Sequence, residues 1–153
     1  MGARRDRRSA DGVAAVEFAL VMMPLIVLVF GLIQYGLYFW AMQGGSDIAR
    51  SASRVAAVDD VNTYTCNAFR TDITDQIGGL AGSAATATVT RTYLDTESPA
   101  GVSVGDKVKV SVQFKSVDLH FPFLPFIRDG VVTATSTSRV DYVRDPDHPP
   151  VNC

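Results

Sequence analysis

The sequence contains few of the residues that usually carry chemistry. Its 153 residues include two cysteines, too few for a disulfide-dense scaffold or a four-cysteine metal site. The two histidines, His120 and His148, have no carboxylate or cysteine at metal-ligand spacing beyond Asp147. Serine-nucleophile elbows are absent, and the glycines of residues 78–82 lack the spacing and the lysine of a phosphate-binding loop. We therefore expect neither an enzyme nor a bound metal or cofactor.

An excess of positive charge is also lacking. The chain has 14 Lys+Arg against 16 Asp+Glu, a formal net charge of -2, so nothing suggests a basic surface that grips nucleic acid. A composition of 47% hydrophobic and 20% charged residues excludes a disordered chain. The informative feature is where the apolar residues lie.

Residues 18–40 form an uninterrupted apolar run of 23 positions without a charged side chain. As a helix, the run is about 35 Å long, enough to cross the hydrocarbon core of a bilayer. The apolar core of a cleaved secretory signal is shorter, about 7 to 15 residues, and ends at a small-residue site that residues 41–44 match poorly. The run therefore predicts a retained membrane-spanning helix.

A basic segment precedes this run. Residues 1–12 contain Arg4, Arg5, Arg7 and Arg8 against two aspartates, and no comparable cluster follows the apolar run. The positive-inside rule then places the N-terminus in the cytoplasm and the chain after residue 40 outside. Without residues 1–12, the balance becomes 14 − 4 = 10 basic against 16 − 2 = 14 acidic residues, or −4. The exported part is mildly acidic.

The pattern stays helical beyond the membrane run. Small residues recur at helical spacing at Gly45, Ala49, Ala52 and Ala56, whereas Arg50, Ser53 and Arg54 lie elsewhere on the helix. We predict one long helix over about residues 13–58, with Pro24 and the Gly44-Gly45 pair as points where it can bend. Apolar residues near a 3.6 period predict a second, shorter amphipathic helix over residues 63–80.

Beyond residue 82 the pattern alternates, as in strands. Residues 84–94, 107–114 and 131–143 are the predicted strands, the last with Val132, Ala134, Val140 and Tyr142 facing inward. The predicted fold is α+β: a long N-terminal helix and a short second helix packed on a small antiparallel sheet of about three strands. The domain division is a leader (1–12), the membrane helix and its extension (13–58), an exterior α+β domain (59–144) and an irregular tail (145–153).

The junction between leader and helix carries the most specific motif. Gly12 follows the basic segment, Val13 begins a stretch of four apolar or small residues, and Glu17-Phe18 follows it. An ionised carboxylate inside a membrane helix is disfavoured by roughly 2.5–3.5 kcal/mol, so it calls for a partner or a function. This arrangement resembles the processing site of type IV pilin-like proteins, specifically the TadE-like minor pseudopilins of the Tad or Flp pilus. Phe18, where the short major pilins carry Tyr, agrees with a TadE-like protein.

The resemblance implies a structural role. A membrane-embedded prepilin peptidase would cut between Gly12 and Val13, leaving Glu17 as the fifth mature residue and Phe18 as the sixth. The new ammonium on Val13 would pair with Glu17 of its own or a neighbouring chain and set the register between subunits. The implied partners are that peptidase, other pseudopilins and the major pilin, the inner-membrane assembly platform and the lipid bilayer. The implied location is the cytoplasmic membrane, crossed once, with a role either in assembling a cell-surface pilus or as a part incorporated in it.

Three features allow two interpretations each. Cys66 and Cys153 both fall on the exterior side, as a disulfide or as two free thiols. Ala15, Ala19, Ala41, Gly45 and Ala49 recur at four-residue spacing, either for close helix–helix approach or as ordinary membrane-helix composition. The apolar residues 120–127, with two prolines, form a loop that more often covers its own core than contacts headgroups or pilus partners.

Two alternatives to a processed pseudopilin are left by the sequence. One is a membrane-anchored exterior binding or scaffold module that keeps its leader. The other is a secreted domain released by signal peptidase near Ala41.

Overall fold

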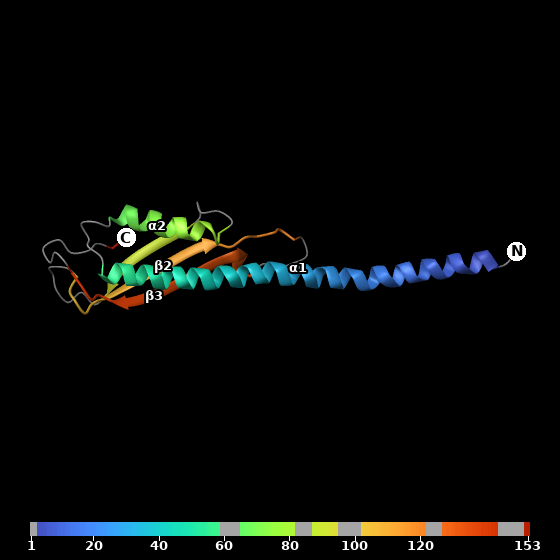
Figure 1. Cartoon of the computed structure of the whole chain (residues 1–153), viewed down its shortest axis with the longest axis horizontal. Helices are drawn as coiled ribbons and strands as arrows, with labels where there is room; N and C mark the ends of the chain where they lie inside the picture. Colours follow the sequence, from blue (N-terminus) through green and yellow to red (C-terminus); the bar gives the residue numbers. More distant parts are fainter. Residues whose placement is uncertain (1–2, 59–64, 82–86, 95–101, 122–126, 144–151) are drawn as a thin grey trace. The chain divides into compact units, whose positions relative to one another are not determined.

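A computed structural model describes residues 3–58, 65–81, 87–94, 102–121, 127–143 and 152–153, with only the backbone for residues 3–11 and 127–128. Its elements are listed here in chain order: α1 (Ala3–Val58), α2 (Cys66–Gly78), β1 (Thr88–Leu94), β2 (Lys107–Lys115), the 3-10 helix η2 (Ile127–Gly130) and β3 (Val131–Arg139) (Figure 1). The predicted α+β class is confirmed.

The chain divides into two compact units. The helix unit comprises Met1–Gly36 and Leu119–Pro125, and the sheet unit comprises Leu37–Asp118 and Phe126–Cys153. Helix α1 contributes its first part to the helix unit and its second part to the sheet unit.

Helix α1 is longer than the sequence predicted. It ends at Val58 as expected but begins at Ala3, so residue 13 was the wrong starting point. The physical reason is that Ala3 and the four arginines have high helix propensity, so the leader extends the helix without a break. The helix also continues through Pro24 and the glycine pair.

The sheet is a three-stranded antiparallel meander in the order β1-β2-β3. Alternate residues of each strand are buried, as the alternation in residues 107–114 predicted. The register aligns Tyr93 with Val108 and Val112 with Ala134, which brings the buried positions to one face. The other face carries mostly threonine and lysine and is exposed.

Two helices cover the buried face of the sheet. Helix α2 starts at its N-cap Thr65, whose hydroxyl accepts a hydrogen bond from the Ala68 N–H, and buries three apolar side chains, Phe69, Ile73 and Ile77. The small residues of α1, whose spacing predicted only that the helix continues, pack against the same core: Gly45, Ala49, Ala52 and Ala56 are all buried. Figure 1 shows α2 and the second part of α1 beside the strands.

The Gly44-Gly45 pair permits the close approach of this packing. A Cβ added at Gly44 would lie 2.5 Å from Leu80 Cδ1, and one at Gly45 would lie 2.9 Å from Phe114 Cε1. The side chains of Leu80 and Phe114 occupy the space that a larger residue at Gly44 or Gly45 would need. The pair therefore serves packing between α1 and the elements around it.

The third strand is shorter than predicted, and the prediction that Tyr142 faces inward was wrong. Strand β3 ends at Arg139, Val140 is buried, but Tyr142 is 55% exposed. After Arg139 the Val140 N–H donates to the Asp106 carbonyl and the Asp141 N–H donates to the Ala57 carbonyl of α1. The chain leaves the sheet here, so the two-residue alternation no longer applies.

Candidate functional site

The Gly12–Val13 peptide bond lies on an open surface of α1. Gly12 is exposed, and a Cβ built on it meets no atom within 4 Å. Val13 is also exposed. Glycine destabilises a helix by about 1 kcal/mol relative to alanine, so local unwinding is less costly here than at neighbouring residues.

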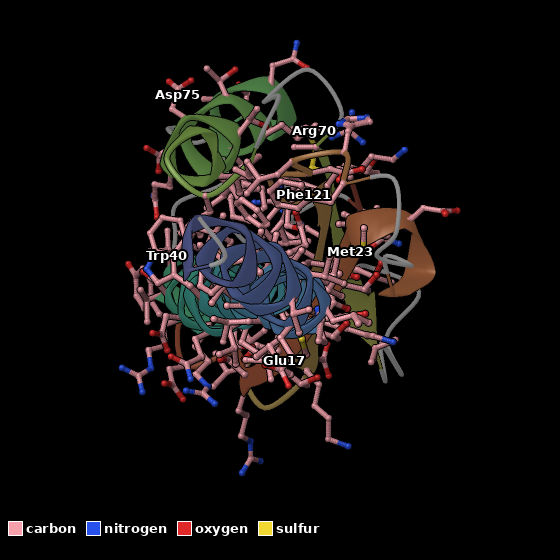
Figure 2. The ribbon with its side chains drawn as sticks, turned by 90° about the vertical axis from the view of Figure 1, so that its right-hand side faces the viewer. Glu17, Met23, Trp40, Arg70, Asp75 and Phe121 are labelled. Carbon is pink, nitrogen blue, oxygen red and sulfur yellow. A yellow bond between two sulfur atoms is a disulfide. The ribbon has the colours of Figure 1, made fainter. Side chains whose placement is uncertain are left out.

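Glu17 and Phe18 project from the same helix without tertiary contacts. Both side chains are exposed, and Figure 2 shows Glu17 pointing away from α1. Among the side chains that the structure describes, none forms an ion pair or hydrogen bond with Glu17. A partner for this carboxylate would come from a newly formed N-terminus or from another chain.

The surface of α1 around these residues is almost entirely apolar. The large hydrophobic side chains from Val13 to Ile33 are exposed in the single chain, including Met23 in Figure 2. Within the described residues, α1 is the one helix long and apolar enough to cross a membrane. The side chains of Arg4, Arg5, Arg7 and Arg8 lie outside those described, so orientation still rests on the positive-inside rule.

The small residues of α1 fall into two groups. Ala15 and Ala19 are exposed, whereas Ala41, Gly45 and Ala49 are buried in the sheet unit. The second group therefore packs within its own domain. Only Ala15 and Ala19 are available for contact with another helix.

Gln34 is a polar residue that the sequence reasoning missed. It is 3% exposed, and its Oε1 accepts a hydrogen bond from the Leu119 N–H at 3.0 Å. In the same unit, the rings of Phe30 and Phe121 lie with centroids 4.6 Å apart. The signal was available, because Gln34 is the one amide side chain in the apolar run of residues 18–40.

These contacts concern the first residues of the loop at 120–127. The favoured interpretation was a loop folded over the core of the sheet domain. His120 and Phe121 group with the helix unit, where the Phe121 ring lies against Phe30, whereas Ile127 begins η2 in the sheet unit. Residues 122–126 lie outside those that the structure describes.

Cys66 and Cys153 are joined by a disulfide in the sheet unit. The bond links the start of α2 to the C-terminus, and the Cα atoms are 5.7 Å apart. Buried Arg91 of β1 lies beside it, with Nη2 3.3 Å from Cys153 Sγ and the guanidinium carbon 4.8 Å from the centre of the Phe69 ring. Arg91 was also missed, although it occupies an inward position between Val89 and Tyr93 in the alternating pattern.

The described part of the chain offers little that fits catalysis. No group of three or more histidine, cysteine or acidic residues gathers there to hold a metal ion. An open hollow of about 560 Å³ near the end of α1 is lined by Arg54, Ser138, Arg139, Asp141 and aliphatic residues.

Residues 12–54 match the family model described as TadE-like protein. The N-terminal segment is TadE-like. This confirms the resemblance predicted from Gly12, Glu17 and Phe18. The TadE-like segment ends within α1, so the strands lie outside the match. No curated protein and no solved structure matches the chain.

Proposed function

We propose that this chain is a minor pseudopilin of a Tad-type pilus. It is a structural protein with one membrane-spanning helix, its N-terminus in the cytoplasm and its sheet domain outside. A prepilin peptidase removes residues 1–12, and the chain then associates through its N-terminal helix with other pseudopilins and the major pilin at the inner-membrane assembly platform.

One observation carries this proposal: the TadE-like match begins at Gly12, the residue after which the cut is proposed. The exposed setting of Gly12 and Val13 supports it, because a peptidase needs access to backbone that it can unwind. The exposed apolar surface from Val13 to Ile33 supports an association through lipid-embedded helices.

The test is cleavage by a prepilin peptidase in cells that express both proteins. Intact-mass analysis of the wild-type chain is expected to show loss of Met1 to Gly12. Gly12→Val is expected to keep the leader, because a β-branched side chain resists the extended threading that glycine permits. Gly36→Val is the matched control, since Gly36 lies on the same helix and also has nothing within 4 Å of an added Cβ.

The other possible outcomes would contradict this proposal in different ways. An intact leader in the wild-type chain would contradict the proposal and indicate an uncleaved anchored module. A loss of about forty residues would indicate a secreted domain released near Ala41. Equal cleavage of both glycine variants would remove Gly12 from the recognised site.

A further inference from the structure

The segment at residues 119–121 is held against α1 by two independent contacts. The Leu119 N–H donates to Gln34 Oε1 at 3.0 Å, and the Phe121 ring lies 4.6 Å from that of Phe30, measured between centroids. Both contacts lie inside the helix unit. The segment therefore lies against the part of α1 that is richest in apolar side chains.

The position of these contacts along α1 gives their depth in a bilayer. At 1.5 Å per residue, Phe30 lies about 18 Å and Gln34 about 24 Å beyond Phe18, where the charge-free run begins. The hydrocarbon core of a bilayer is about 30 Å thick. If Phe18 marks the inner boundary, both contacts fall in the outer half of the hydrocarbon.

Gln34 provides what irregular backbone needs at that depth. An unsatisfied backbone N–H in hydrocarbon costs several kcal/mol, so such a chain must find partners within the protein. Gln34 is buried and accepts the N–H of Leu119. The sequence that follows includes Pro122 and Pro125, which have no N–H to satisfy.

We propose that residues 119–121 form a second membrane contact, lying in the outer leaflet beside α1. The segment contacts the acyl chains of that leaflet. The side chains agree, since Leu119 and Phe121 are apolar and the sequence of residues 119–127 contains no Asp, Glu, Lys or Arg. The inference rests on α1 spanning the membrane, which is part of the proposed function.

This contact leaves uncovered the side of α1 that carries Glu17, the residue proposed to pair during assembly. Phe30 follows Glu17 by 13 residues, which at 100° per residue places the two side chains about 140° apart around the helix. Viewed along α1, Glu17 and Phe121 lie on different sides of the helix (Figure 2). Lipid contact by the segment therefore does not compete with pairing at Glu17.

Depth-dependent tryptophan quenching tests the proposal with the full chain. The single native tryptophan is removed by Trp40→Phe, and Phe121→Trp is placed in this background, which keeps an aromatic ring against Phe30. The chain is reconstituted in phosphatidylcholine and phosphatidylglycerol vesicles that contain a lipid with a nitroxide on its acyl chain. Leu25→Trp reports on the span itself, and Tyr142→Trp reports on an exposed aromatic of the sheet unit.

We expect the nitroxide to quench Phe121→Trp and Leu25→Trp several-fold more than Tyr142→Trp. Adding Gln34→Leu is expected to reduce the quenching of Phe121→Trp, because the Leu119 N–H loses its partner and the segment moves toward water. Gln43→Leu, at an exposed position of α1, is the matched control and is expected to change nothing.

Three outcomes would overturn the inference. If Leu25→Trp is quenched by the lipid but Phe121→Trp only by aqueous iodide, the span is correct and the segment lies in water. If lipid quenching of Phe121→Trp disappears as the protein-to-lipid ratio rises, a second copy of the chain covers the segment. If neither tryptophan is quenched by the lipid, the membrane span of the proposed function fails as well.

Discussion

Ser53 illustrates how single residues join α1 to the sheet. Its side chain is fully buried, and its Oγ lies 3.0 Å from the Arg50 carbonyl, 3.0 Å from Ser136 Oγ and 2.8 Å from Ser138 Oγ. The Ser53 hydroxyl donates to the Arg50 carbonyl and to Ser136 Oγ, which share its single proton, and its lone pairs can accept from the Ser138 hydroxyl. The sequence placed Ser53 away from the packed stripe, which was wrong, because the inward positions of β3 that it meets are themselves polar.

Replacing this hydroxyl should lower stability by a small, measurable amount. Ser53→Ala is expected to reduce the free energy of unfolding by about 1 kcal/mol, the usual net contribution of a buried hydrogen bond. Chemical denaturation followed by circular dichroism in one detergent measures the difference. Ser51→Ala, at an exposed position of α1 two residues earlier, is the control and should be neutral. Equal effects in the two variants would show that the serine contacts contribute nothing.

At the scale of elements, the C-terminus completes the edge of the sheet. The Arg91 N–H donates to the Cys153 carbonyl at 3.0 Å, and the Cys153 N–H donates to the Arg91 carbonyl at 2.8 Å. The Tyr93 N–H donates to Asn152 Oδ1 at 2.8 Å. Strand β1 is an edge strand, and these contacts satisfy groups that would otherwise invite pairing with another chain. The tail was expected to be irregular, and its residues 145–151 lie outside those described.

The disulfide should be what holds this edge closed. It joins residues separated by 87 positions, and the chain-entropy model assigns a loop of that size about 4–5 kcal/mol. Cys66→Ser with Cys153→Ser is therefore expected to lower the free energy of unfolding by several kcal/mol. Hydrogen exchange should also accelerate at the amides of Arg91 and Tyr93, which lose their acceptors when the C-terminus detaches.

Asn152→Ala separates the two contributions. It keeps the disulfide but removes the acceptor of the Tyr93 N–H, so the expected loss is about 1 kcal/mol and the Arg91 amide should stay protected. Unchanged stability and unchanged exchange in the double cysteine variant would contradict a stabilising role for the bond.

For the whole molecule, the informative property is the exposed apolar helix with a single carboxylate on it. The exposure of the side chains from Val13 to Ile33 in the single chain fits a helix that is long and apolar enough to span a membrane. Glu17 lies among them with no ion-pair partner in the described residues. Under the proposed function, both features would matter for assembly rather than for the folding of one chain.

Removing the charge of Glu17 should impair assembly and spare the earlier steps. Glu17→Gln is expected to insert and to lose Met1 to Gly12, since neither step needs the carboxylate. Its recovery with other pilus components should fall by about tenfold or more, because losing even ~1.4 kcal/mol of pairing corresponds to a tenfold change. Crosslinking and co-purification from pilus-producing cells measure this recovery. The control is Asp75→Asn, at an exposed position of α2 (Figure 2). Wild-type recovery of Glu17→Gln would mean that the carboxylate simply reaches the headgroups.

Local patterns explain why much of the fold was predictable. The apolar run from residue 18, the 3.6 period of α2 and the alternation of Val108, Val110 and Val112 each depend on neighbours within a few residues. Those periods decide element type and the buried face, and they were correct. The Gly12, Glu17 and Phe18 motif is also local, which is why the TadE-like segment could be recognised before its structure was known.

Other features depend on residues that are far apart in the chain. Ser53 meets Ser136 across 83 positions and Gln34 meets Leu119 across 85, and no periodicity specifies which positions will face each other. Tyr142 was misplaced because the Asp141 N–H pairs with α1 instead of the sheet. The sequence by itself determined the elements, their buried faces and the family of the N-terminal segment. Only the tertiary structure decided the polar contacts and the closed sheet edge, because a buried polar group must be satisfied by whichever partner the packing brings to it.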